Sequence, residues 1–543
     1  MKIRNTACFL EDHACSRPFQ RAVVFPEGRA EHGRVTYSQL NFQQLDAVAS
    51  TLATGFLELG IKRGDRVSLF VRPSLEFVGI VFAVFKIGAV PVLIDPGMGL
   101  KAVLKCLETI KPDALIAEPI VQAMRPIFPK AFSSVRHRVT AGSSTWYWGG
   151  VTLAQCKRSG GAAFRAVDVE PDEDAAILFT SGSTGPAKGV TYTHRIFNAQ
   201  TQHIQEMYGI QPGEIDLPCF PLFGLFSVAM GVTIVVPDMD PTKPAEADPA
   251  LLVEAILDQG CTAIFGSPAL LHPLAAYCVK HEIQLPKVCR VLSAGAPIPP
   301  DLHESFSKIL SVGAEIHTPY GATEALPVAT IGSSAVLQET AAETRSGRGT
   351  CVGRLAPNIE LAIIPIEDAP IEDWATVEQL PAGAIGEICV KGPVVTREYK
   401  AEPEHTRGSK IQDGAGWWHR MGDVGYLDSE GRLWFCGRKA HRVVCSDGTV
   451  LFPVRCEGVF NAHQDVYRTA LVAIDGQPVL IVELRSGLTR RAELCDELRE
   501  LGAGHEETAQ IKTFLYHPSF PVDARHNAKI DRPALALWGA GKV

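Results

Sequence analysis

The segment ILFTSGSTGPAKG, residues 177–189, combines side chains whose types and spacing suit a phosphate group. Its glycines let backbone N–H groups turn toward an anion, while four hydroxyl side chains and Lys188 add further donors. A Walker A loop needs Gly-Lys followed by Ser or Thr, whereas Lys188 follows Ala187 and precedes Gly189. The segment therefore predicts a phosphate-binding loop that is not a P-loop, with a surface loop rich in serine and glycine as the structural alternative.

Apolar helix and strand patterns alternate through the first part of the chain. The strand-like stretch AAILF precedes the loop and would carry it at the edge of a sheet, where α/β proteins commonly bind ligands. Helix-then-strand patterns recur at 75–94, 102–117 and 250–265. Another helix is expected to begin at about Tyr37, where the preceding threonine and a glutamine have capping-box spacing. This alternation predicts an α/β fold with a largely parallel sheet and helices on its faces.

The sequence changes character near residue 437. The stretch 470–484 reads as two strands joined by an Asp-Gly turn, and 490–501 reads as an amphipathic helix. We therefore expect a large N-terminal domain of packed sheets and helices, residues 1–436, and a small α+β domain, residues 437–543.

Composition excludes several classes of protein. The net charge of −8 over 543 residues argues against a nucleic-acid partner. Fourteen cysteines without a C-x-x-C pair argue against a zinc site and favour reduced thiols. No signal peptide is evident, and Glu76 and Lys86 interrupt the most apolar region, so no transmembrane segment is expected. A cytoplasmic protein is the prediction.

Six motifs occur in the order found in one superfamily. After TSGSTGPAKG come YGATE, WWHRMGDVGYLD, CGRKAHRV, GTVLFPVRCE and ARHNAKIDR. Together they resemble the adenylate-forming superfamily of acyl-CoA synthetases, luciferases and peptide-synthetase adenylation domains. The resemblance covers roughly residues 20 to 532, and it implies ATP and Mg²⁺ as cofactors and a mobile C-terminal domain.

The resemblance also implies the ATP site. Its nucleotide-binding residues would be Thr180, Ser181, Gly182, Ser183, Thr184, Gly185, Lys188, Gly295, Ala296, Tyr320, Gly321, Asp423 and Arg438. Tyr320 would stack beside adenine, and Asp423 would accept hydrogen bonds from the ribose hydroxyls because a carboxylate is an acceptor only. Arg438 would contact ribose or phosphate. An exposed carboxylate in a turn and a solvated arginine are the plain structural alternatives.

The same resemblance implies three catalytic residues. Thr323 would contact the α-phosphate, while Glu324, together with Thr184, would bind Mg²⁺ as hard oxygen ligands. Lys529 would stabilise the charge that develops when a carboxylate attacks the α-phosphorus. It would arrive on the mobile domain once the substrate is bound. A surface lysine near the C-terminus is the alternative for Lys529.

Apolar segments rich in small residues predict the acid-binding pocket. The pocket residues would be Phe220, Phe223, Gly224, Phe226, Phe265, Gly266, Ser267 and Ala325. Such a lining suits an acyl chain better than an amino acid, which would need a buried carboxylate for its ammonium group. Ordinary core packing is the alternative for many of these side chains.

The sequence departs from the CoA-forming members at features tied to their second half-reaction. Gly224 replaces a histidine linked to acyl access, and Ala440 replaces the Asp or Lys of the hinge. Met421, Arg455 and Ala187 replace the usual Thr, Glu and Pro of three motifs. The adenylation set is intact, so we infer that the second nucleophile is not CoA.

Within the superfamily, PLFGLF, VVPDMDPTKPAE and HTPYGATEALPV resemble the β-lactone synthetases of bacterial long-chain olefin biosynthesis. That resemblance implies a long-chain 2-alkyl-3-hydroxy acid as substrate, and a β-lactone decarboxylase and a ketone reductase as pathway partners. Three alternatives stay open. They are a long-chain acyl-CoA synthetase, an enzyme that loads acyl groups on a carrier protein, and a nucleotide-binding pseudo-enzyme.

Overall fold

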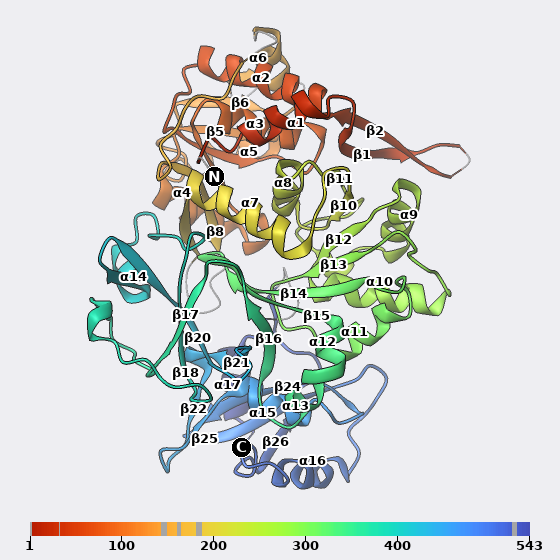
Figure 1. Cartoon of the computed structure of the whole chain (residues 1–543), viewed down its shortest axis with the longest axis vertical. Coiled ribbons are helices and arrows are strands. Elements are labelled where there is room, and N and C mark those ends of the chain that lie inside the picture. The colour runs from red at the N-terminus through yellow and green to blue at the C-terminus, as the bar shows by residue number, and fades with distance from the viewer. Residues whose placement is uncertain are drawn as a thin grey trace.

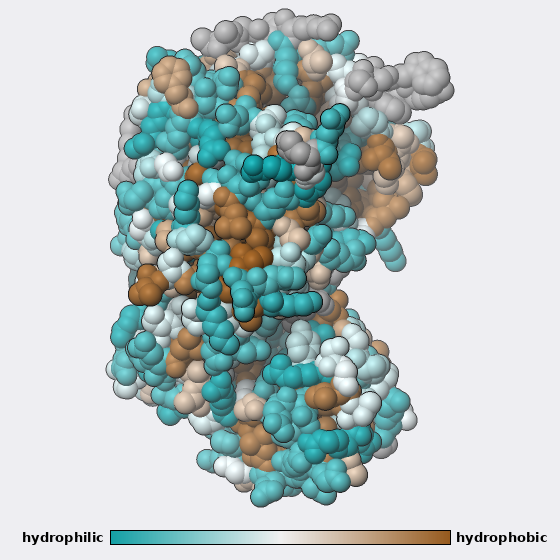
Figure 2. Space-filling model, turned by 90° about the vertical axis from the view of Figure 1, so that its right-hand side faces the viewer, coloured by the Kyte–Doolittle hydropathy of each residue, from teal (hydrophilic) through white to brown (hydrophobic). Residues whose placement is uncertain are grey.

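The computed structural model describes residues 3–31, 33–142, 149–159, 164–180, 187–523 and 529–542. Figure 1 shows a large body, coloured red to green, above a smaller unit coloured blue. The outline narrows between the two in the view of Figure 2, where hydrophilic residues cover most of the face and a hydrophobic patch lies at mid-height. None of the helices in the described ranges is long and apolar enough to cross a membrane.

The first sheet carries the phosphate-loop hairpin at one edge. Its strand order is β7-β6-β5-β3-β4-β8-β9, parallel except for the β8–β9 pair. The strands are β3 (Arg66–Phe70), β4 (Val90–Leu93), β5 (Ala114–Ala117), β6 (His137–Thr140), β7 (Val151–Thr152), β8 (Asp174–Thr180) and β9 (Lys188–Thr193). The accompanying helices are α1 (Cys8–Ser16), α2 (Phe42–Glu58), α3 (Leu75–Lys86), α4 (Leu100–Ile110), α5 (Pro119–Met124), α6 (Leu153–Ser159) and α7 (His194–Tyr208).

The predicted start of α2 is wrong. Residues 35–41 form strand β2, and the helix begins at Phe42 after a capping box made by Asn41 and Gln44. Tyr37 and its neighbours instead pair with β1, and the true helix cap is Asn41 at the end of strand β2. The predicted helix–strand pairs at 75–94, 102–117 and 250–265 are confirmed.

A second sheet of fourteen strands holds the remaining candidate site residues. Its order is β17-β18-β20-β21-β16-β15-β14-β13-β12-β10-β11-β1-β2, with β19 paired to β20. From β11 through β10, β12 and β13 to β14 the neighbours are parallel, and from β14 to β17 they are antiparallel. The change of direction at β14 leaves the β14–β15 turn at the carboxyl ends of the parallel strands, where α/β sheets bind ligands.

The bounds of this sheet and its helices are as follows. Its strands are β1 (Arg21–Arg29), β2 (Val35–Asn41), β10 (Ile215–Pro218), β11 (Thr233–Val235), β12 (Ala263–Gly266), β13 (Arg290–Ser293), β14 (Glu315–Ala322), β15 (Ala325–Gly332), β16 (Thr350–Leu355), β17 (Glu360–Ile364), β18 (Gly386–Lys391), β19 (Lys410–Asp413), β20 (Gly416–Leu427) and β21 (Leu433–Arg438). The helices that accompany it are α8 (Pro221–Ala229), α9 (Pro249–Gln259), α10 (Pro268–Lys280), α11 (Pro300–Ser307), α13 (Ala341–Arg345) and α14 (Pro403–Ser409).

The small unit has a sheet and hydrophobic clusters of its own. It comprises β22 (Val443–Val444), β23 (Val450–Leu451), α15 (Pro453–Phe460), β24 (Val466–Ile474), β25 (Gln477–Leu484), α16 (Leu494–Ala503), β26 (Thr513–Tyr516) and α17 (Arg532–Ala540). Positive φ angles at Asp475 and Gly476 make the tight turn between β24 and β25, as the Asp-Gly pair predicted. Two clusters built only from residues 443–538 cover its three-stranded sheet.

Candidate active site

Strands β8 and β9 flank the predicted phosphate loop, which they join as an antiparallel pair. Thr180 pairs with Lys188 in the β8–β9 ladder, so the two ends of this hairpin lie side by side in the sheet. The predicted residues Ser181, Gly182, Ser183, Thr184 and Gly185 lie outside the described residues, and their roles stay predictions.

The β14–β15 turn carries the predicted Thr323 and Glu324 between two antiparallel strands. Gly321 has a φ of 159°, and a Cβ there would lie 2.5 Å from the carbonyl oxygen of Ala325. Only glycine allows this close approach of the two strands. The tight hairpin therefore fixes the backbone of the two residues that the sequence assigned to catalysis.

Asp423 of β20 lies at the centre of a buried polar group. Its Oδ2 accepts a hydrogen bond of 2.6 Å from the Tyr320 hydroxyl, and its Oδ1 lies 2.7 Å from Nη1 of Arg438. The negative charge of Asp423 raises the pKa of Arg438, while burial and the same carboxylate raise the pKa of Tyr320 well above its usual value. These three predicted nucleotide-binding residues are thus brought together.

Two tyrosines that the sequence analysis missed hold the β14–β15 turn. The Tyr192 hydroxyl donates to the carbonyl oxygen of Thr323 at 2.6 Å, and the Tyr399 hydroxyl donates to Oε1 of Glu324 at 2.6 Å. Burial and the neighbouring Glu324 raise the pKa of Tyr399 above its usual range. A single sequence carries no signal for these contacts, because each joins residues far apart in the chain.

A buried lysine behind this turn was also missed. The Lys410 side chain is only 5% exposed in strand β19, and its Nζ lies 3.3 Å from the Thr396 hydroxyl. Burial lowers the pKa of Lys410 to about 7. The adjacent His419 is also buried, and burial together with Lys410 lowers its pKa well below the usual value. The backbone amide of Thr396 donates in turn to the Glu324 carbonyl at 2.9 Å.

Four predicted pocket phenylalanines form one aromatic group around the start of α8. The rings of Phe223 and Phe265 stack with centroids 3.9 Å apart, and Phe220 and Phe226 lie 5.6 and 6.3 Å from Phe223. Stacked rings at the carboxyl end of β12 make an apolar wall that suits an alkyl chain.

The other predicted site residues occupy different surroundings. Ser267 follows β12, and its buried hydroxyl has no hydrogen-bond partner among the described residues. Gly295, at a φ of 99°, and the half-buried Ala296 follow β13. Gly266 packs against Leu270 and Leu271, and Ala325 is fully buried in the core beside β14. The burial of Ala325 agrees with core packing, and its role in the pocket stays a prediction.

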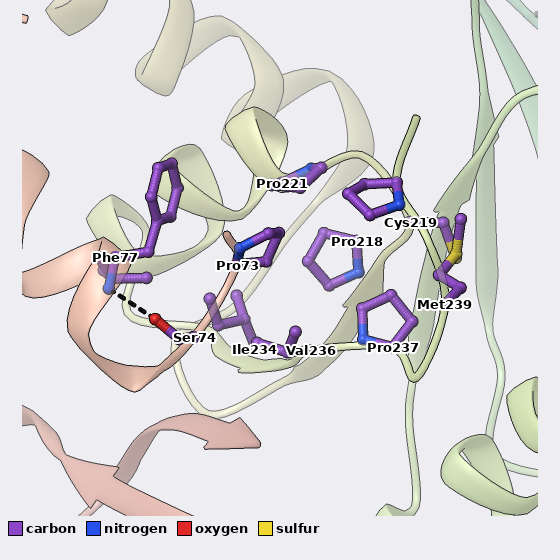
Figure 3. A pocket seen from close by; sticks show the side chains of 12 residues that line it. Pro73, Ser74, Phe77, Pro218, Cys219, Pro221, Ile234, Val236, Pro237 and Met239 are labelled. Carbon is purple, nitrogen blue, oxygen red and sulfur yellow. Dashed lines mark hydrogen bonds between the residues drawn. The ribbon is translucent and has the colours of Figure 1, made fainter. Parts of the chain in front are cut away.

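Gly224 lies at the wall of an apolar crevice. A Cβ on Gly224 would meet the side chains of Pro218 and Ile234 at 3.3 Å, and both of these line the crevice. Figure 3 shows the rings of Pro73, Pro218, Pro221 and Pro237 around it, between the start of α3 and the ends of β10 and β11. A histidine at position 224 would press on this wall, which accounts for the small residue there.

The backbone of Lys529 makes two hydrogen bonds with Asp523. Its amide donates to Oδ1 of Asp523 at 2.9 Å, and its carbonyl accepts from the Asp523 amide at 3.1 Å. These contacts join Asp523 and Lys529 within the small unit, and Lys529 is half-buried. The catalytic role of Lys529 stays a prediction.

Arg455 and residues beside Ala440 join the two units. Ala440 is exposed, but Lys439 beside it pairs with the buried Glu387, and Arg442 pairs with Asp368 at 2.6 Å. Nε of Arg455 donates a hydrogen bond of 2.8 Å to the carbonyl oxygen of Gly347, and its Nη2 pairs with the carboxylate of Glu507. Met421 is buried and accepts at its carbonyl from Arg438.

The residues around Asp423 fit a nucleotide. Each carboxylate has about four lone-pair sites, so Asp423 can still accept from ribose hydroxyls while it holds Tyr320 and Arg438. Nε of Arg438 is buried without a hydrogen-bond partner among the described residues. Such a donor is open to a polar group of a bound ligand. The carboxylate of Glu324 is a hard oxygen ligand of the kind that Mg²⁺ prefers.

The comparisons with known proteins place the chain in one family. The model of the AMP-binding enzyme family matches residues 10–400, and the chain belongs to that family. The amide bond synthetase McbA from Marinactinospora thermotolerans has the same fold, with a TM-score of 0.79 at 23% identity over 98% of this chain and 99% of that one.

Two relatives are similar along almost their whole length. The olefin β-lactone synthetase of Xanthomonas campestris pv. campestris is 47% identical over 99% of this chain and 97% of its own. The enzyme of that name from Stenotrophomonas maltophilia is 46% identical over 99% of this chain and 98% of its own. Both similarities include the small unit that the family model does not cover.

Proposed function

We propose that this protein is an ATP-dependent β-lactone synthetase. Its substrate is a long-chain 2-alkyl-3-hydroxy acid, and its products are a β-lactone, AMP and diphosphate. The observation that carries the proposal is the 47% identity to an olefin β-lactone synthetase along nearly the whole of both chains. The group of buried Asp423 with half-buried Tyr320 and Arg438 supports the nucleotide half of the reaction.

The first step transfers the adenylyl group. A carboxylate oxygen of the acid attacks the α-phosphorus of ATP, a P–O bond forms, and diphosphate leaves with the electrons of the broken P–O bond. Tyr320 stacks beside adenine, Asp423 accepts hydrogen bonds from the ribose hydroxyls, and Arg438 contacts ribose or phosphate. Thr323 and Lys529 contact the α-phosphate. Glu324 would hold Mg²⁺, and the ion would supply positive charge to offset that of the phosphates. Lys529 acts from the small unit, residues 437–543, which closes over the large domain.

The second step closes the ring within one molecule. The 3-hydroxyl oxygen attacks the acyl carbon, the C–O bond of the four-membered ring forms, and AMP leaves as the hydroxyl proton is released. Because the nucleophile is tethered to the acyl group, orientation replaces capture of a second substrate from solution. Gly224 and Ala440 stand where CoA-forming enzymes keep residues tied to their second substrate, which agrees with a reaction that needs no CoA.

The apolar wall of Phe223 and Phe265 binds an alkyl chain, and exclusion of water there protects the acyl adenylate from hydrolysis.

The lactone is the substrate of a β-lactone decarboxylase, and the hydroxy acid comes from a ketone reductase, in the cytoplasm.

The test is product analysis with and without CoA. The protein is incubated with ATP, Mg²⁺ and a long-chain 2-alkyl-3-hydroxy acid, and the products are identified by mass spectrometry and NMR. A β-lactone formed with AMP in the absence of CoA supports the proposal. A strict requirement for CoA, or for a carrier-protein thiol, contradicts it and favours an acyl-CoA synthetase or a carrier-loading enzyme.

A further inference from the structure

The segment 396–400 bridges the phosphate-loop hairpin and the β14–β15 turn. The amide of Lys400 donates to the carbonyl of Gly189 at 2.7 Å, and Tyr399 forms an isolated antiparallel bridge with Val190. At its other end, the amide of Thr396 donates to the Glu324 carbonyl at 2.9 Å, and its hydroxyl donates to the same oxygen at 3.1 Å. One short stretch therefore fixes the distance between the two segments assigned to phosphate and metal.

The side chain of Tyr399 contacts a charged residue of each segment. Its hydroxyl donates to Oε1 of Glu324 at 2.6 Å, and Nζ of Lys188 lies 5.2 Å from the centroid of its ring. Tyr399 is only 7% exposed, while Glu324 and Lys188 are half-buried, so both contacts are partly shielded from water and strengthened by it.

We propose that Tyr399 is a positioning residue of the adenylation half-reaction. Its hydroxyl fixes the rotation of the Glu324 carboxylate so that one oxygen remains aimed at Mg²⁺, and its ring holds the Lys188 ammonium beside the phosphates. The inference rests on the proposed Mg²⁺- and ATP-dependent reaction, but it concerns the assembly of the metal and phosphate site and not the fate of the acyl adenylate.

The physical reason is preorganisation. A carboxylate without a second partner rotates freely, and metal binding must then fix that rotation at a cost in entropy. When a tyrosine hydroxyl donates to one carboxylate oxygen, this rotation is already fixed in the folded protein. A phenylalanine at position 399 keeps the ring and its contact with Lys188 but loses the donor.

The test uses Tyr399→Phe with Tyr208→Phe as its matched control. Tyr208 is equally buried at 7% exposure, and its hydroxyl bonds to the Thr330 hydroxyl at 3.1 Å, away from the proposed metal ligand. Binding of Mn²⁺ to the complex of enzyme and ATP is measured by electron paramagnetic resonance without the acid. Exchange between ATP and diphosphate is measured with the acid as Mg²⁺ is varied.

We expect Tyr399→Phe to weaken Mn²⁺ binding and to raise the Mg²⁺ concentration for half-maximal exchange, each by about tenfold, as for loss of a hydrogen bond to a charged group. Tyr208→Phe should change neither value. Tyr399→Leu should in addition weaken binding of metal-free ATP, because Lys188 then loses the aromatic face.

A double-mutant cycle separates positioning from general destabilisation. When Glu324 is already Gln, Tyr399→Phe should add no further loss of Mn²⁺ affinity. Additive losses, equal effects of Tyr399→Phe and Tyr208→Phe, or unchanged Mn²⁺ affinity in Tyr399→Phe would each overturn the proposal. Because Mn²⁺ binding is measured without the acid, the outcome does not depend on whether the product is a lactone.

Discussion

The substitution Asp423→Asn tests the nucleotide site. Asp423 is 5% exposed, and its two oxygens hold the Tyr320 hydroxyl at 2.6 Å and Arg438 at 2.7 Å. An asparagine has nearly the same shape but one acceptor oxygen and no charge, so it cannot hold Arg438 and accept from both ribose hydroxyls.

The size of the effect follows from these contacts. A hydrogen bond to a charged group contributes about 1.5–3 kcal/mol. The Arg438 side chain is 35% exposed, so solvent screening places the expected loss near the lower end, at about 2 kcal/mol. That loss corresponds to an increase of about thirtyfold in the KM for ATP.

The assay is exchange between ATP and diphosphate at varied ATP and saturating acid. Asp413→Asn is the control, because Asp413 pairs with Lys391 at 2.7 Å in a different strand and has no predicted contact with ATP. An unchanged KM for ATP in Asp423→Asn, or an equal change in Asp413→Asn, would refute the assignment of Asp423 to the ribose.

Three further predictions address other parts of the site. Lys529→Ala should abolish most AMP formation while ATP still binds, as measured by product release and by calorimetry; full turnover would remove Lys529 from the mechanism. Phe223→Ala should raise the KM for the acid by about tenfold or more and leave the KM for ATP unchanged, because it removes a stacked ring from the apolar wall; a selective effect on ATP would contradict the pocket assignment. Lys410 has a folded-state pKa of about 7 against 10.5 when exposed, so between these values the unfolded state binds more protons and stability rises with pH. The free energy of unfolding, measured with denaturant, should therefore rise with pH above pH 7 in the wild-type protein by up to about 1.4 kcal/mol per pH unit relative to Lys410→Met. The same pH dependence in both proteins would show that burial does not lower the pKa of Lys410.

Much of the fold could be predicted from local patterns. The helix–strand alternation at 75–94 and the Asp475-Gly476 turn depend on neighbouring residues, and both are confirmed. The predicted start of α2 was wrong because Thr36 and Gln39 have capping-box spacing but lie in a strand. The pairing of that strand with β1 overrides the local preference for a helix cap.

The candidate site was predicted where a short motif carries the chemistry. Tyr320, Asp423 and Arg438 come from three separate motifs, and the structure brings them within hydrogen-bond distance. Tyr192, Tyr399 and Lys410 were missed because their partners are set by long-range packing and not by spacing in the sequence. Ala325 is fully buried in a hydrophobic cluster, and its place in the pocket lining stays a prediction.

The central claim is that one molecule of acid is first adenylated and then captured by its own hydroxyl group. The most direct test uses an acid with ¹⁸O in both carboxylate positions and follows the label by mass spectrometry in the absence of CoA. Adenylation followed by internal capture should place one ¹⁸O in AMP and one in the carbonyl of the β-lactone, with the unlabelled hydroxyl oxygen in the ring. AMP without label, or labelled AMP accompanied only by the free acid, would contradict it.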